Sequence, residues 1–310
     1  MRILVLGAGG IGGYYGARIQ AAGGDITFLV RPTRAAQLLE NGLRVSSPFG
    51  DLRLTPKVLT KETLNETFDL IIVSCKAYDL DSAMAAIAPA VGEQSLILPL
   101  LNGVRHIDTL IARFGAAHVL GGVALISVML APDGEIRHLN KMHRLVTGAL
   151  GTTRPPCLQE LASLLNGAAL EFVLSDNIEQ AMWDKIVFLS TLAGATCTMR
   201  ASIGDILNTL AGEELITGLF AECAETAAAC GHAVSEMQLA TYRKQLTEPG
   251  SGLMASMLRD VERGAETEAE HILGDLVGRA QTKGVATPLL RLAYSHLQAY
   301  AARRKAATPA

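Results

Sequence analysis

The stretch VLGAGGIGGYYGARI at residues 5–19 constrains the fold more than any other part of the chain. An apolar run of the kind that forms strands leads directly into a glycine cluster, and helix-forming residues follow it. The cluster has G-x-G-x-x-G spacing and consists of Gly7, Ala8, Gly9, Gly10, Ile11 and Gly12. In this pattern the glycines allow a tight turn, a close approach of the backbone to a pyrophosphate, and close packing of helix on strand. The stretch therefore predicts a dinucleotide-binding strand, turn and helix.

The residues that follow alternate short apolar strands with helical stretches. We expect strands at residues 2–8, 25–30, 43–47, 69–76, 95–102 and 119–130. Several are apolar throughout, which is typical of parallel strands covered by helices on both faces. The alternation predicts an α/β fold with an N-terminal Rossmann-type parallel sheet. Residues 131–150 are interpreted as a turn, a strand, a second turn and a second strand, an antiparallel pair that ends this domain.

The second half of the chain has helical periodicity only. Helices are expected at 176–197, 212–231, 235–246, 252–264, 267–284 and 287–304, with caps such as Asp176 and Thr267. A chain of 310 residues has the length of two ordinary domains. The change of pattern places the boundary near residues 166–176. We therefore expect a Rossmann domain at residues 1–170 and an all-helical domain at 171–310.

The composition of the chain excludes several classes of binding partner. The apolar fraction is 49%, but no run approaches the ~20 apolar residues of a membrane span, so no membrane partner is expected. A net charge of −3 gives no reason to expect a nucleic-acid surface. The five cysteines are scattered, and the histidines form no ligand set, so neither disulfides nor a metal site are predicted. Because no signal sequence follows Met1, we expect a cytoplasmic protein with a small-molecule ligand. A homodimer is left open.

The end of the second strand indicates which dinucleotide binds. An acidic residue there would bind the free ribose hydroxyl of NADH, but this strand is followed by Arg31, with Arg34 close behind. An arginine in this place accommodates the 2′-phosphate of NADPH. We therefore expect NADP(H) as the cofactor, with a solvated surface arginine as the alternative.

Ligands of such sheets bind outside the carboxyl ends of the strands. Lys76 follows one strand of the expected sheet, close to Ser74, and Asn102 follows the next. These residues are candidates for the crevice. Lys76 extending to solvent and Asn102 capping a turn remain the alternatives.

Lys185 lies in the middle of an apolar helix face. The face consists of Ile178, Ala181, Met182, Lys185, Ile186 and Leu189. Burial of an amine lowers its pKa toward the range of a general acid, which reduction of a ketone requires. The alternative is a lysine whose stem packs on the apolar face while its ammonium reaches water or an acid.

Two further polar residues lie on later helices. Glu268 shares a row with Ile272 and Leu276 and can point inward, although a glutamate in a first turn is also favoured by the helix dipole alone. The sequence leaves open whether Ser256 is simply a hydroxyl on a helix face or contacts a ligand.

These residues and the motifs around them resemble those of the ketopantoate reductase (2-dehydropantoate 2-reductase) family over nearly the whole length of the chain. The matching stretches are ILVLGAGGIGGYYGARI, FLVR, VSCKAYD, LNGV, MWDKIVF, SMLRDVERGAETEAEHILG and GVATPLL. The resemblance implies an N-terminal Rossmann domain, a helical C-terminal domain and an active site in the cleft between them. It also implies that Arg31 binds the 2′-phosphate of NADPH, and that Lys76 and Asn102 line the cofactor and substrate cleft.

The resemblance further implies roles for three residues of the helical domain. Lys185 is the expected general acid, which protonates the C2 oxygen of the substrate. Ser256 is expected near the substrate carboxylate, and Glu268 is expected to assist substrate binding or to orient the lysine. The implied activity is NADPH-dependent reduction of a 2-oxo acid to a 2-hydroxy acid, with 2-dehydropantoate, reduced to pantoate for pantothenate and coenzyme A biosynthesis, as the default substrate.

The chain departs from the family pattern at three places. Leu189, Ala193 and Leu253 stand where the family has asparagines. Apolar residues would leave polar groups of the substrate unpaired, at about 1 to 3 kcal/mol each. A less polar 2-oxo acid is therefore an alternative substrate. A non-catalytic NADPH-binding sensor and a two-domain dehydrogenase of 3-hydroxy acids are alternatives of a different kind.

Overall fold

The computed structural model describes residues 1–151 and 157–307. The chain divides into two compact units. The first contains Met1–Leu101 and His106–Glu179, and the second contains Asn102–Arg105 and the chain from Gln180 onward. A short piece that follows a strand of the first unit therefore belongs to the second.

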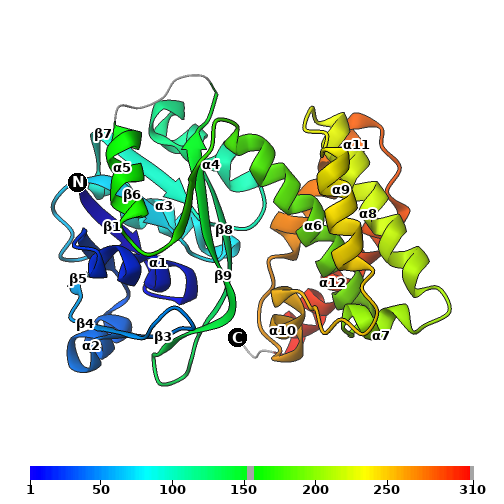
Figure 1. The fold of residues 1–310 in the computed structure, drawn as a ribbon, viewed down its shortest axis with the longest axis horizontal. Helices are drawn as coiled ribbons and strands as arrows, with labels where there is room; N and C mark the ends of the chain where they lie inside the picture. The colour runs from blue at the N-terminus through cyan, green and yellow to red at the C-terminus, as the bar shows by residue number, and fades with distance from the viewer. Residues whose placement is uncertain (152–156, 308–310) are drawn as a thin grey trace. The chain divides into compact units, whose positions relative to one another are not determined.

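The first unit is built on a parallel sheet with the strand order β5-β2-β1-β6-β7 (Figure 1). The strands are β1 (Arg2–Leu6), β2 (Asp25–Leu29), β5 (Lys57–Leu59), β6 (Phe68–Val73) and β7 (Val91–Pro99). The main helices of this unit are α1 (Gly10–Ala21), α2 (Pro32–Asn41), α3 (Leu80–Ile87), α4 (Arg105–Phe114) and α5 (Cys157–Asn166). The expected α/β class is confirmed, with β1 at the centre of the sheet.

A second sheet in this unit corrects two expectations. Its strands are β3 (Leu43–Ser46), β4 (Leu52–Leu54), β8 (Leu120–Leu130), β9 (Ile136–Ala149) and β10 (Glu171–Leu174). The strands expected at 43–47 and 119–130 do not join the parallel sheet, because β3 pairs with β4 and β9, and β8 pairs antiparallel with β9. Residues 136–149 form one strand and not two. The apparent turn is a shift of register opposite Ile126 and Val128, where the Asn140 side chain accepts from the Ser127 amide at 3.2 Å.

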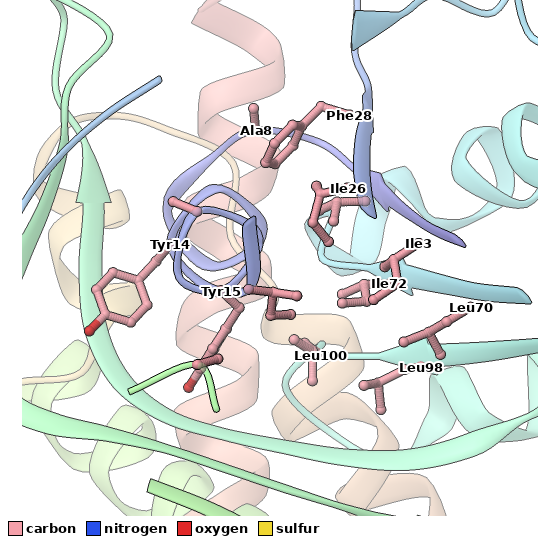
Figure 2. Packing of buried hydrophobic residues seen from close by; sticks show 14 of the residues in the cluster. Ile3, Ala8, Tyr14, Tyr15, Ile26, Phe28, Leu70, Ile72, Leu98 and Leu100 are labelled. Carbon is pink, nitrogen blue, oxygen red and sulfur yellow. The ribbon is translucent and has the colours of Figure 1, made fainter. Parts of the chain in front are cut away.

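Helix α1 packs against both sheets. In the buried cluster of Figure 2, Tyr14 and Tyr15 point from the helix to the side away from Ile3 and Ile72. The Tyr15 hydroxyl donates to the Arg144 carbonyl of β9 at 3.0 Å, and the Tyr14 hydroxyl lies 3.1 Å from Nδ1 of His143. Both tyrosines are fully buried. The helix that carries the glycine motif is therefore fixed on two sides.

The second unit is helical, as expected. It contains α6 (Ile178–Met199), α7 (Ile203–Leu207), α8 (Gly212–Ala229), α9 (Glu236–Leu246), α10 (Ser256–Glu262), α11 (Asp275–Lys283) and α12 (Pro288–Ala307). A π-helical turn at Glu270–Gly274 precedes α11. The start of α12 is capped from α8, since the Leu289 and Leu290 amides donate to the buried Glu222 carboxylate at 2.9 and 2.7 Å. No helix among the described residues is long and apolar enough to cross a membrane.

Replacement of Gly16 by alanine tests the packing of α1. A Cβ atom on Gly16 would lie 2.6 Å from the Phe28 ring of β2, closer than packed atoms come. We expect Gly16→Ala to lower the free energy of unfolding by about 1 to 3 kcal/mol, measured by urea denaturation. Gly9→Ala is the control, because a Cβ there meets no atom within 4 Å. Equal stability of the two variants would contradict the close packing.

Candidate active site

The glycine loop between β1 and α1 has the features that a bound dinucleotide requires. Gly7 has a φ of +89°, which only glycine adopts easily, and a Cβ on Gly12 would lie 2.3 Å from Oγ of Ser74. Gly9 faces open space. The first intrahelical bond runs from the Gly13 amide to the Gly9 carbonyl at 2.9 Å, so the preceding amides are available to a ligand. The loop therefore fits a pyrophosphate.

The rest of the motif is held by neighbouring elements. Ser74 follows β6 and donates to the Leu6 carbonyl at the end of β1 at 3.2 Å. Ala8 is buried, while Ile11 and Gly10 are partly buried. These contacts fix the loop while leaving Gly9 accessible.

The two arginines near β2 have different surroundings. Arg34 donates to the Ala8 carbonyl at 3.0 Å and to the Gly134 carbonyl at 3.1 Å, which ties the glycine loop to the β8–β9 turn. The side chain of Arg31 is 83% exposed and forms an ion pair with Asp79 at 3.5 Å. Arg34 is therefore committed to the protein backbone, whereas Arg31 has only a solvent-exposed partner. The sequence did not separate these roles.

Lys76 lies at the same end of the sheet. It precedes the short 3₁₀ turn Ala77–Asp79, which leads into α3, and is partly buried. Lys76 thus follows the carboxyl end of β6, and its part in a ligand crevice stays a prediction.

Asn102 belongs to the second unit. The neighbouring Gly103 has a φ of +93°, and a Cβ there would lie 2.8 Å from the His271 carbonyl. Arg105 forms an ion pair with Glu270 at 3.5 Å. The Asn102–Arg105 segment thus packs against the π-helical turn, two residues after Glu268.

Lys185 and Glu268 interact within the second unit. Lys185 is partly buried and Glu268 is only 6% exposed. Burial lowers the pKa of Lys185 to about 8, and the negative charge of Glu268 acts in the opposite direction. The pKa of His271 is lowered by burial and by Arg105, while the charge of Glu268 acts in the opposite direction. An ammonium with a pKa of about 8 can release a proton near neutral pH, which is the property of a general acid.

Ser256 lies on another helix, next to a segment that contacts a later turn of α6. It is exposed and is the first residue of α10. The preceding amide, of Ala255, donates to Oγ1 of Thr196 at 3.4 Å. Thr196 lies three turns beyond Lys185, or about 16 Å along the helix axis. The structure therefore anchors the segment before Ser256 to a later turn of α6 than the one that carries Lys185.

Two positions of α6 beyond Lys185 and one position of a later segment carry apolar side chains. Leu189 is partly buried and Ala193 is buried. Leu253 is partly buried, and its carbonyl accepts from the Ile203 amide at 3.0 Å. No group of three or more His, Cys, Asp or Glu residues in the described parts of the chain could hold a metal ion.

Sequence reasoning missed two features of these sites. The π-helical turn after Glu268 has no recognisable signal in the sequence, although such turns occur often at functional sites. Asp79, the partner of Arg31, was not singled out. Its position between Lys76 and α3 could have drawn attention to it.

Comparison with known proteins gives one family. The family model "Ketopantoate reductase PanE/ApbA" matches residues 3–152, and "Ketopantoate reductase PanE/ApbA C terminal" matches residues 177–301. The uncharacterized oxidoreductase YkpB of Bacillus subtilis (strain 168) is 34% identical, and the alignment covers 98% of this chain and 100% of that protein.

The similar solved structures include a member of the same family. The crystal structure of 2-dehydropantoate 2-reductase from Geobacter metallireducens GS-15 has a TM-score of 0.87 at 28% identity and covers 96% of this chain and 99% of its own. D-mandelate dehydrogenase with NADH and anilino(oxo)acetate shares the fold, with a TM-score of 0.88 at 20% identity over 98% of this chain and 99% of its own. The family expected from the sequence is confirmed. The chain is an oxidoreductase and belongs to the ketopantoate reductase family.

Proposed function

We propose that this protein reduces a 2-oxo acid to a 2-hydroxy acid with NADPH in the cytoplasm, and that 2-dehydropantoate, reduced to pantoate for pantothenate and coenzyme A biosynthesis, is its substrate. In this proposal residues 1–170 bind the cofactor and residues 171–310 bind the substrate and supply the acid. The observation that carries it is the partly buried Lys185, whose pKa of about 8 reflects burial opposed by Glu268. A surface lysine would have no reason for such a value.

Lys185 performs the proton transfer in this proposal. When bound, the cofactor supplies a hydride to the carbonyl carbon of the substrate. The charge that develops on the carbonyl oxygen is neutralised by the proton that Nζ of Lys185 donates. Because a pKa of about 8 lies above neutral pH, the protonated form of Lys185 predominates there. The negative charge of Glu268 favours the charged form of Lys185 and therefore keeps this acid protonated.

The remaining site residues bind and orient. The amides around Gly9 and the first turn of α1 hold the pyrophosphate, and Arg31 pairs with the 2′-phosphate. Lys76 and Asn102 line the cofactor and substrate site. Ser256 contacts the carboxylate region of the substrate.

A second candidate substrate has its own support. Leu189, Ala193 and Leu253 offer a substrate no hydrogen bonds from their side chains. A pantoyl group with a hydroxyl would leave that hydroxyl unpaired against such a surface. A 2-oxo acid with an apolar side chain would gain from the same contacts. We therefore keep a less polar 2-oxo acid as the alternative.

A substrate panel tests the proposed reaction. The protein is mixed with NADPH and a series of 2-oxo acids that includes 2-dehydropantoate and acids with apolar side chains. We expect the absorbance of the reduced cofactor to decay, fastest with 2-dehydropantoate, and faster with NADPH than with NADH. No decay with any acid would indicate a non-catalytic sensor. Appreciable oxidation of 3-hydroxy acids with NADP would indicate a dehydrogenase of the other class.

Replacement of Lys185 tests the general acid. Without the donor, the carbonyl oxygen has no positioned proton, and we expect Lys185→Met to lower kcat by about 100-fold or more. Lys244→Met is the control, since Lys244 is an exposed lysine on α9 of the same unit. NADPH affinity, measured by fluorescence quenching, should stay unchanged in both variants. A near-normal kcat for Lys185→Met would remove this residue from the role.

The pH dependence follows from the lowered pKa of Lys185. Because the acid must be protonated to donate, kcat/KM for reduction should be constant below about pH 8 and fall at higher pH. Glu268 raises the pKa of Lys185, so Glu268→Gln should move this alkaline limb to lower pH. A limb that stays in place in Glu268→Gln would show that another group titrates.

A further inference from the structure

The ion pair between Arg31 and Asp79 spans the carboxyl end of β1. In the sheet β1 lies between β2 and β6, and Leu6, its last residue, is level with Leu29 and with Val73. Arg31 follows β2 and Asp79 follows β6, so their side chains meet over the strand that leads into the glycine loop. Strands two apart in a sheet are separated by about 10 Å. The pair therefore bridges the crevice in which a dinucleotide would lie.

The carboxylate of Asp79 is not used by its own helix. Asp79 occupies the N-cap position of α3, where an aspartate ordinarily accepts from an amide of the first turn, but its side chain makes no capping bond. Its backbone is fixed, since its amide donates to the Lys76 carbonyl at 2.9 Å and its carbonyl accepts from Oγ of Ser82 at 2.9 Å. The carboxylate instead lies 3.5 Å from Nη2 of Arg31.

Both members of this pair are accessible to a ligand. The side chain of Arg31 is 83% exposed and that of Asp79 is 39% exposed. An ion pair in water is weak, and a more highly charged anion can replace one partner. Arg34, by contrast, is bonded to two backbone carbonyls and is not free to exchange. Of these two arginines, Arg31 is the one whose partner can be displaced.

We propose that Asp79 competes with the 2′-phosphate of the cofactor for Arg31 and thereby sets how strongly the protein prefers NADPH to NADH. This inference rests on the proposed use of NADPH. A phosphate carries more charge than a carboxylate and has more acceptor oxygens for a guanidinium, so it displaces Asp79. The displaced Asp79 carboxylate stays close to Arg31 and reduces the affinity that the phosphate gains from this arginine. A cofactor without the 2′-phosphate gains nothing from Arg31.

Two nucleotides that differ only in the 2′-phosphate provide the test. Binding of adenosine 2′,5′-bisphosphate and of adenosine 5′-monophosphate is measured by isothermal titration calorimetry at low ionic strength. We expect Asp79→Asn to bind the bisphosphate about three- to five-fold more tightly than the wild type does. Binding of the monophosphate should stay within about two-fold. Asp81→Asn is the matched control, because Asp81 is exposed, lies two residues away and carries the same charge.

A double-mutant cycle distinguishes competition for Arg31 from simple repulsion. Arg31→Ala should weaken binding of the bisphosphate and leave the monophosphate unchanged. Asp79→Asn in the Arg31→Ala background should then give no gain. A gain that persists undiminished in that background, a gain of equal size in Asp81→Asn, or no gain in Asp79→Asn would each overturn the competition.

The same data separate this inference from the proposed cofactor. If the wild type binds the bisphosphate no more tightly than the monophosphate, the assignment of NADPH is wrong, and the role of Asp79 is wrong with it. If the wild type prefers the bisphosphate and Asp79→Asn leaves that preference unchanged, the cofactor assignment stands and only the role of Asp79 is overturned.

Discussion

The close contact between α1 and β1 is the constraint on which the first unit depends. Gly12 and Gly16 leave no room for a side chain between the helix and the strands beside it, since a Cβ on either would lie within 2.6 Å of a neighbouring side-chain atom. The same closeness brings the first amides of the helix to the end of β1, where a phosphate can reach them. Tyr14 and Tyr15 use the other side of the helix to hold the second sheet. Packing and ligand recognition are therefore two results of one run of small residues.

In the second unit the corresponding constraint is electrostatic. Lys185 is subject to two opposed effects, because burial favours its neutral form and Glu268 favours its charged form. Burial without the glutamate would lower the pKa of the amine further, and a glutamate without burial would leave an ordinary surface cation. A proton donor that works near neutral pH requires both. Helix α6 supplies the burial, and the segment before the π-helical turn supplies the charge.

Local patterns predicted the parts of the structure that local patterns determine. The glycine motif gave the first strand, turn and helix, and the apolar face of α6 drew attention to Lys185. The short strands β3 and β4 could not be assigned to the second sheet, because pairing partners distant in the chain decide which sheet a strand joins. The five-residue helix α7 is too short to show periodicity, although the Ser202 and Asp205 capping box marks its start. The roles of Lys185, Arg31, Lys76, Asn102, Ser256 and Glu268 remain predictions.

The connectivity of the two units has a consequence for any attempt to study them apart. Residues Asn102–Arg105 leave β7 of the first unit but are part of the second, so the chain passes between the units at three places. A fragment that begins at Gln180 would lack the four residues that cover the His271 carbonyl and pair with Glu270. A single cut in the polypeptide therefore cannot yield an intact helical half, and a functional separation would require that short loop to be supplied in trans or grafted onto the fragment.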